Sequence, residues 1–134
     1  MVRPDVREVR IQKEEDLLHA RQAIRELSTE MGFGLVDQTR LVTAVSELTR
    51  NAFKYAGGGV LALEHIERNG KTGIRVTVTD HGPGIADIEL AMTAGYSSSN
   101  GLGHGLSGSK RLMDGLEIQS KVGEGTKVVA VKWM

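Results

Sequence analysis

Apolar residues recur along this chain at two spacings, which predict helices in some segments and strands in others. In residues 14–31 and 37–56 they recur every three or four positions, so each segment is predicted to be a helix with one buried face. The apolar face of the second helix is formed by Leu41, Val45, Leu48, Ala52 and Tyr55. Alternation of apolar and polar residues predicts strands at residues 6–12, 60–67, 73–80, 116–122 and 126–133.

Glycine-rich turns separate these segments. Gly32 and Gly34 end the first helix and residues 57–59 end the second, because glycine adopts the left-handed conformation that follows many helices. Residues 68–71 and 123–125 are predicted as the turns of two hairpins.

The stretch between the two hairpins is predicted to hold a short helix at residues 86–93, a polar loop or lid at residues 95–105, and a further helix at residues 106–114. Helices early in the chain and hairpin-connected strands late predict an α/β (α+β) two-layer sandwich. Its sheet would be mixed and mostly antiparallel, with the helices on one face. At 134 residues, the chain is expected to form a single domain over residues 1–134.

Composition excludes several classes of function. Lysine plus arginine and aspartate plus glutamate number 17 each, so no net charge indicates binding to nucleic acid or to an anionic membrane. The chain has no cysteine, which excludes disulfides, thiolate metal sites and cysteine nucleophiles. No apolar run approaches the ~18 residues of a membrane span, and the N-terminus lacks a signal-peptide core, so a cytoplasmic location is expected.

Two polar side chains on the second helix are candidates for chemistry. Glu47 and Asn51 are four residues apart, so they stack one turn above the other on a face different from the apolar stripe. The Asn amide oxygen can bind Mg²⁺, and the Glu carboxylate can orient or deprotonate a hydroxyl. Glu and Asn also face solvent on most helices, so this pair alone does not distinguish a site from an ordinary helix surface.

An acidic residue continues the apolar row of one predicted strand. Ile74, Val76, Val78 and Asp80 share one parity and therefore point to the same face of the sheet. Because an unpaired buried carboxylate is costly, Asp80 is expected to meet a hydrogen-bond donor there. A carboxylate that faces an apolar pocket suits an exocyclic amine such as that of adenine.

A glycine-rich stretch at residues 101–105 leads into the helix predicted to begin at Leu106. Backbone N–H groups that open onto a helix N-terminus suit phosphate oxygens. Residues 103–108 formally match the dinucleotide pattern G-x-G-x-x-G, but no apolar strand precedes them, as that fingerprint requires. Together with the three polar side chains described above, the stretch predicts a site for ATP and Mg²⁺.

Four short motifs resemble the nucleotide boxes of the GHKL (Bergerat-fold) ATPases, in the same order and each beside the expected element. They are Glu47-x-x-x-Asn51-x-x-Lys54-Tyr55, Asp80-x-Gly82-x-Gly84, Gly101-x-Gly103-x-Gly105 and Gly123-x-Gly125-Thr126. The resemblance implies that Asn51 holds Mg²⁺, that Glu47 is the catalytic base and that Asp80 binds the adenine amine.

The same resemblance implies roles for the remaining residues of the boxes. Gly82 and Gly84 would shape the adenine pocket, and Thr126 would line it. The residues expected around the phosphates are Lys54, Gly101, Gly103, His104, Gly105 and Leu106. No catalytic role is expected for the histidine.

Longer matches narrow the resemblance to the RsbT-type serine/threonine switch kinases of bacterial partner-switching pathways, which are related to anti-sigma factors. The matching stretches are residues 31–40, 46–51 and 101–114, and the likeness covers nearly the whole chain. It implies an ATP-dependent kinase that phosphorylates a serine or threonine of a STAS-domain partner in a stress or sigma-factor pathway. Activation of a PP2C-type phosphatase by binding is a further implication.

Two other functions remain open at this point. An anti-sigma factor of the same fold, which sequesters a sigma subunit, has the same nucleotide boxes. The match at residues 101–114 favours the switch kinase over this alternative. A nucleotide sensor without catalysis is the third possibility, and the presence of both Glu47 and Asn51 argues against it.

Overall fold

The computed structural model describes residues 6–84 and 106–134. Within these ranges the elements are, in chain order, β1 (Val6–Ile11), α1 (Glu15–Met31), α2 (Leu35–Ala56), β2 (Gly59–Arg68), β3 (Lys71–Asp80), α4 (Leu106–Leu112), β4 (Gly115–Lys121) and β5 (Gly125–Trp133). The short helix predicted at residues 86–93 and the loop predicted at residues 95–105 lie outside the described residues.

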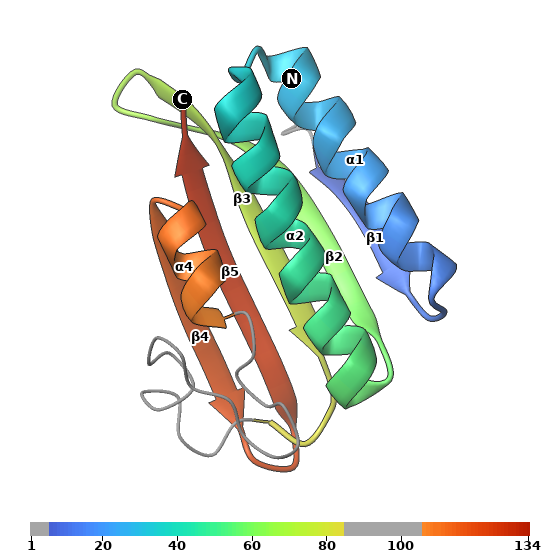
Figure 1. Cartoon of the computed structure of the whole chain (residues 1–134). Coiled ribbons are helices and arrows are strands. Elements are labelled where there is room, and N and C mark those ends of the chain that lie inside the picture. Colours follow the sequence, from blue (N-terminus) through green and yellow to red (C-terminus); the bar gives the residue numbers. More distant parts are fainter. Residues whose placement is uncertain (1–5, 85–105) are drawn as a thin grey trace.

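The five strands form one sheet in the order β1-β2-β3-β5-β4. Every pairing between them is antiparallel, so the parallel pairing that a mixed sheet would contain is not found among the described strands. Figure 1 shows α1, α2 and α4 in a layer on one face of this sheet. The predicted two-layer α+β architecture, with helices on one face, is confirmed.

Helix α2 has the central place in the helical layer, because it packs against both neighbouring helices and the sheet. The side chains of Leu41, Val45, Leu48 and Ala52 are buried, as the periodicity predicts, whereas Tyr55 is half-buried. They meet apolar residues of the sheet in one core cluster, among them Leu61, Leu63, Ile74, Val76 and Val128.

The two long helices begin and end close to the predicted residues. Gly32 follows α1 with a φ of 90°, and its N–H bonds back to the last turn of the helix. The second helix begins at Leu35, two residues earlier than predicted. The N–H of Gln38 donates to the carbonyl of Gly34 at 2.9 Å, so the first turn already forms there.

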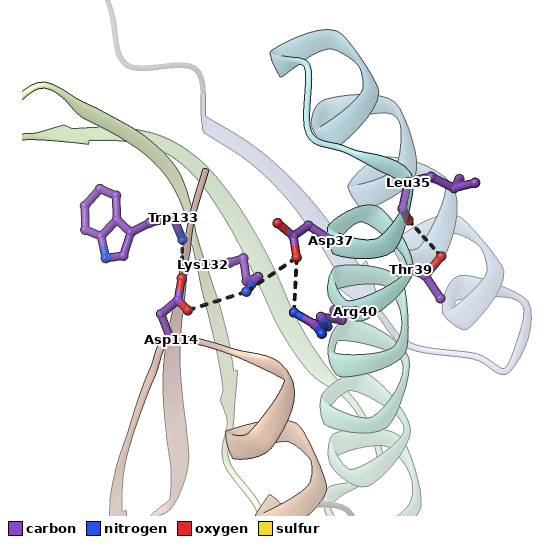
Figure 2. Close-up of polar contacts among 7 residues, drawn as sticks. All are labelled: Leu35, Asp37, Thr39, Arg40, Asp114, Lys132 and Trp133. Atoms are coloured by element: carbon purple, nitrogen blue, oxygen red, sulfur yellow. Dashed lines mark hydrogen bonds and ion pairs between the residues drawn. The ribbon is translucent and has the colours of Figure 1, made fainter.

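At one end of the sheet, a buried lysine joins three elements. The Lys132 side chain on β5 is 8% exposed, and its Nζ lies 3.6 Å from Asp37 Oδ1 on α2 and 3.4 Å from Asp114 Oδ1 (Figure 2). The other oxygen of Asp114 accepts a 2.6 Å hydrogen bond from the N–H of Trp133. Two carboxylates and one ammonium thus connect the start of α2, the turn after α4 and the end of β5.

The turn between β1 and α1 depends on a buried carboxylate. Oδ2 of Asp16 accepts hydrogen bonds from the N–H groups of Gln12 (2.9 Å) and Lys13 (3.1 Å), and Oδ1 lies 3.2 Å from His19 Nδ1. The hydrogen bond from Gln12 is the largest cause that lowers the pKa of Asp16 below its ordinary 3.8, and burial opposes it.

No helix within the described ranges is both long and apolar enough to cross a membrane.

The lowered pKa of Asp16 makes stability depend on pH in the acidic range. The charged carboxylate stabilises the fold fully above its unfolded-state pKa, and this stabilisation is lost as the pH falls through the lower folded-state pKa. Asp16→Asn keeps an acceptor oxygen but removes the charge. We expect its thermal midpoint to lie below that of the wild type at neutral pH, and the gap to narrow below about pH 4.

Glu15→Gln is the matched control, because Glu15 lies in the same turn but is exposed and pairs with Lys13 at the surface. Thermal unfolding from pH 7 to pH 2, followed by circular dichroism, measures the difference. An Asp16→Asn midpoint that follows the wild type in parallel over this range would contradict the assignment.

Candidate functional site

The end of β3 is tied to the start of β5 by one carboxylate oxygen. Oδ1 of Asp80 accepts hydrogen bonds from the N–H of Gly82 at 3.0 Å and from the N–H of Thr126 at 3.2 Å. Asp80 and Thr126 are also direct partners in the β3–β5 register. The expectation that Asp80 meets hydrogen-bond donors is therefore confirmed.

Glycines allow the backbone to approach closely around this carboxylate. Gly125 has a φ of 119°, and a Cβ there would lie 2.1 Å from the carbonyl oxygen of Asp80. Gly84 has a φ of 77°, and a Cβ there would lie 2.5 Å from the carbonyl oxygen of Lys121. A Cβ on Gly82 would lie 2.4 Å from the Cβ of Ala56, at the last residue of α2. Three segments are thus held against one another at this end of the sheet.

Hydroxyl groups complete the junction on the side of the last hairpin. Ser120 Oγ lies 2.9 Å from Thr126 Oγ1 and donates to the carbonyl of Gly125 at 3.0 Å. A cavity of about 330 Å³ opens beside them. It is lined by residues 79–81, 119–121 and 124–127.

The polar face of α2 presents the other predicted residues. Glu47 and Asn51 are both half-buried, one turn apart. Oε1 of Glu47 accepts a 3.1 Å bond from Nη1 of Arg50, and the Glu47 side chain is 28% exposed. Lys54 is exposed, and its Nζ lies 5.3 Å from the ring centre of Tyr55, a distance typical of a cation–π contact.

The predicted phosphate residues are described only in part. Gly101, Gly103, His104 and Gly105 lie outside the described residues. Leu106 begins α4, as predicted, and that helix packs against α2. The start of α4 therefore lies in the same helical layer as Glu47 and Asn51 (Figure 1).

A family comparison decides the class of this fold. Residues 36–133 match the model of the histidine kinase-, DNA gyrase B- and HSP90-like ATPases. The chain belongs to this ATPase family. The predicted GHKL membership is thereby confirmed, since the four motifs Glu47–Tyr55, Asp80–Gly84, Gly101–Gly105 and Gly123–Thr126 all fall within the matched range.

Within this ATPase family, the chain is similar to curated proteins of two kinds. It is 49% identical to the serine/threonine-protein kinase RsbT of Bacillus subtilis over 126 residues, which are 94% of this chain and 95% of that protein. It is 32% identical to the anti-sigma F factor of Pasteuria penetrans, over 84% of this chain and 79% of that protein. The anti-sigma F factor of Clostridium acetobutylicum is also 32% identical, over 90% of this chain and 87% of that protein. The first of these relatives is a serine/threonine-protein kinase, which is the enzyme class predicted from the sequence.

A solved structure supports the fold. The crystal structure of the RsbU and RsbW domains of Rv1364c from Mycobacterium tuberculosis superposes with a TM-score of 0.64 at 20% identity. The match covers 98% of this chain and 32% of that longer chain.

Two contacts at the site were not anticipated from the sequence. The bond between Ser120 and Thr126 requires the register of β4 against β5, and its only signal in the sequence is the shared parity of Ser120 with Leu116 and Ile118. The ion pair between Arg50 and Glu47 follows from their spacing of three on a helix, which is a pattern that can be recognised in a sequence.

The close approach at Gly125 predicts that a methyl group there is not tolerated. Gly125→Ala adds a side chain at a positive φ and places it against the backbone of Asp80, so we expect a loss of about 1–3 kcal/mol in the free energy of unfolding. Gly115→Ala is the control, because a Cβ at that position meets nothing within 4 Å. Chemical denaturation of both variants measures the effect, and equal midpoints would contradict it.

Proposed function

We propose that this chain is an ATP-dependent serine/threonine protein kinase that phosphorylates a STAS-domain partner in a bacterial partner-switching pathway. The 49% identity to RsbT along nearly the full length of both chains carries this proposal. The geometry supports it, because the polar face of α2, the Asp80 junction and the start of α4 belong to one end of a known ATPase fold. The proposed location is the cytoplasm, where ATP is available.

We assign the adenine end of the nucleotide to the Asp80 junction. Both described bonds to the Asp80 side chain are made to Oδ1, and no described residue donates to Oδ2. The second oxygen can therefore accept from the exocyclic amine of adenine. In this proposal Gly82 and Gly84 shape the adenine pocket, and Thr126, which lines the cavity described above, lines it.

We assign the phosphate end to α2 and to the stretch before α4. Within the described residues, no group of three or more acidic or histidine side chains could hold a metal ion by itself. The amide oxygen of Asn51 fits Mg²⁺ that takes its other ligands from nucleotide phosphates and water, which is usual for this ion. In that position Mg²⁺ would neutralise phosphate charge. Lys54, the glycines at 101, 103 and 105, His104 and Leu106 are the proposed phosphate contacts.

Glu47 is the proposed base for the transfer. The acceptor hydroxyl oxygen of the partner attacks the γ-phosphorus, the bond from that phosphorus to the bridging β-oxygen breaks, and the hydroxyl proton passes to the Glu47 carboxylate. The products are ADP and the phosphorylated partner. We propose that the acceptor hydroxyl belongs to the partner.

A second function is favoured by a specific observation, the 32% identity to two anti-sigma F factors. A chain of that kind would sequester a sigma subunit.

For the switch kinase, we also propose that the chain activates a PP2C-type phosphatase by binding it. Incubation with labelled ATP, Mg²⁺ and a STAS-domain protein from the same organism tests transfer directly. Co-purification of a sigma subunit instead, without transfer, would favour the alternative.

The first prediction from this proposal concerns the adenine. In Asp80→Asn the amide can keep its oxygen toward Gly82 and Thr126, and it then presents an NH₂ group to the adenine NH₂ group. We expect ATP binding to weaken by about 1.5–3 kcal/mol, the usual contribution of a hydrogen bond to a charged group. Titration calorimetry measures this loss. Glu124→Gln is the control, because Glu124 lines the same cavity but pairs with Lys121 at the surface. An affinity equal to that of the wild type in a folded Asp80→Asn would refute the assignment.

The second prediction separates the base from the metal ligand. Glu47→Gln keeps the shape but loses the basic oxygen, so ATP should still bind while transfer falls roughly 10²–10⁴-fold. Asn51→Ala should weaken both Mg²⁺-dependent ATP binding and transfer. Neither change should lower the thermal midpoint much, because the buried stripe lies on another face of α2. Single-turnover transfer at saturating ATP distinguishes the two, and a wild-type rate in Glu47→Gln would remove the base from the mechanism.

A further inference from the structure

Ser120 on β4 lies in one row with the two side chains assigned to the adenine end of the site. It pairs with Thr126 in the β4–β5 register, and Thr126 pairs with Asp80 in the β3–β5 register, so the three side chains stand side by side across three strands. The next row on the same face of the sheet belongs to the hydrophobic core, through Val78 and Val128. The polar row therefore lies at the edge of the core, on the face of the sheet that the helices cover.

The hydrogen bonds in this row determine where each hydroxyl proton points. Ser120 Oγ lies 3.0 Å from the carbonyl oxygen of Gly125, and Ser120 is the donor because a carbonyl only accepts. A serine hydroxyl has one proton, so in the 2.9 Å contact with Thr126 Oγ1 the serine oxygen accepts and the threonine donates. The hydrogen bonds therefore run from Thr126 to Ser120 and from Ser120 to the carbonyl of Gly125.

This direction turns the Thr126 proton away from the neighbouring carboxylate. A hydroxyl beside a carboxylate commonly donates to it, because hydrogen bonds to a charged acceptor are the stronger ones. Among the described residues, the Asp80 carboxylate instead accepts two bonds on Oδ1, from the backbone N–H groups of Gly82 and Thr126. Ser120 thus keeps the threonine proton off Asp80. The second carboxylate oxygen and the lone pairs of the threonine hydroxyl are left as acceptors on neighbouring strands.

We propose that Ser120 is a positioning residue for recognition of the nucleobase, because it makes the edge formed by Asp80 and Thr126 purely accepting. This inference rests on the proposed kinase function, and it adds the rule by which the site selects its nucleotide. The exocyclic amine of adenine has two N–H donors and suits such an edge. Hypoxanthine and guanine carry a carbonyl oxygen at the same ring position, and that oxygen would face acceptors alone.

The backbone of two other segments surrounds the Ser120 hydroxyl. A Cβ added to Gly84 would lie 3.2 Å from Ser120 Oγ, so the glycine passes directly beside the hydroxyl. The N–H of Gly123 donates to the carbonyl of Pro83 at 2.9 Å, which ties the last hairpin to the same segment. Ser120 itself is half-buried. The position of its hydroxyl is therefore set by the protein rather than by solvent.

The test compares ATP with inosine triphosphate, in which a carbonyl oxygen replaces the adenine amine. In Ser120→Ala the Thr126 proton is released to turn toward Asp80 or toward a base carbonyl. We expect ATP affinity to fall about 3–10-fold, and the preference for ATP over inosine triphosphate to fall about tenfold. Titration calorimetry with Mg²⁺ measures ATP binding, and competition with ATP measures the weaker nucleotide. A purely structural role for Ser120 would weaken both nucleotides equally, so an unchanged preference overturns the proposal.

A double-mutant cycle shows whether Ser120 acts through Thr126. Thr126→Val keeps the shape of the side chain but removes the hydroxyl, so it should also lower the preference for ATP. Adding Ser120→Ala to Thr126→Val should lower the preference no further, and a second loss of similar size would contradict the proposal. Thr77→Val is the matched control, because Thr77 lies on β3 with the opposite parity to Asp80 and so faces the other side of the sheet. It should leave both affinities unchanged.

Ser120→Cys keeps the inference testable if Ser120→Ala does not fold. A thiol has nearly the shape of the hydroxyl but is a weak donor and a weak acceptor, so the preference for ATP should again fall. A preference equal to that of the wild type overturns the proposal. Transfer of phosphate to a STAS-domain protein is measured separately. If ATP binds but no phosphate is transferred, the kinase proposal fails, and the two nucleotide affinities still decide the role of Ser120.

Discussion

The burial of one stripe of α2 is the constraint on which the other features of this molecule depend. Leu41, Val45, Leu48 and Ala52 can leave water only if α2 lies along the sheet in one rotational setting. Each residue is turned by a fixed angle relative to its neighbours, so this setting also determines where the polar residues point. The buried stripe therefore fixes the positions of the polar residues Glu47, Arg50 and Asn51.

The sheet contributes a second fixed point at the end of β3. Asp80 belongs to an apolar row, but its carboxylate is compensated by two backbone donors from different segments, Gly82 and Thr126. This arrangement makes the carboxylate a structural link between β3 and β5 as well as the proposed binding group for adenine. Glycine at position 125 is required because the two backbones approach each other too closely for any side chain.

The sequence predicted the structure correctly where a short repeat of apolar residues indicates which face of a helix or strand packs against the rest of the fold. The stripe of α2 correctly predicted four buried side chains, and the parity of Asp80 correctly predicted that its carboxylate meets hydrogen-bond donors, because helices and strands present their side chains at fixed intervals. The first turn of α2 was predicted two residues late, since the exposed Leu35 and Val36 do not continue the apolar stripe. The contact of Lys132 with Asp37 and Asp114 could not be anticipated, because it depends on how three distant segments meet.

The two kinds of ion pair in this molecule respond differently to ionic strength. Mobile ions screen charges that water reaches, but they have little access to a side chain such as Lys132, which is 8% exposed. The pair between Arg50 and Glu47 lies at the surface and is open to this screening. Salt would thus loosen the contact that occupies the proposed base before it loosens the contacts that hold the helices to the sheet. A rise in ionic strength therefore alters the polar face of α2 before it alters the contact between α2 and the sheet.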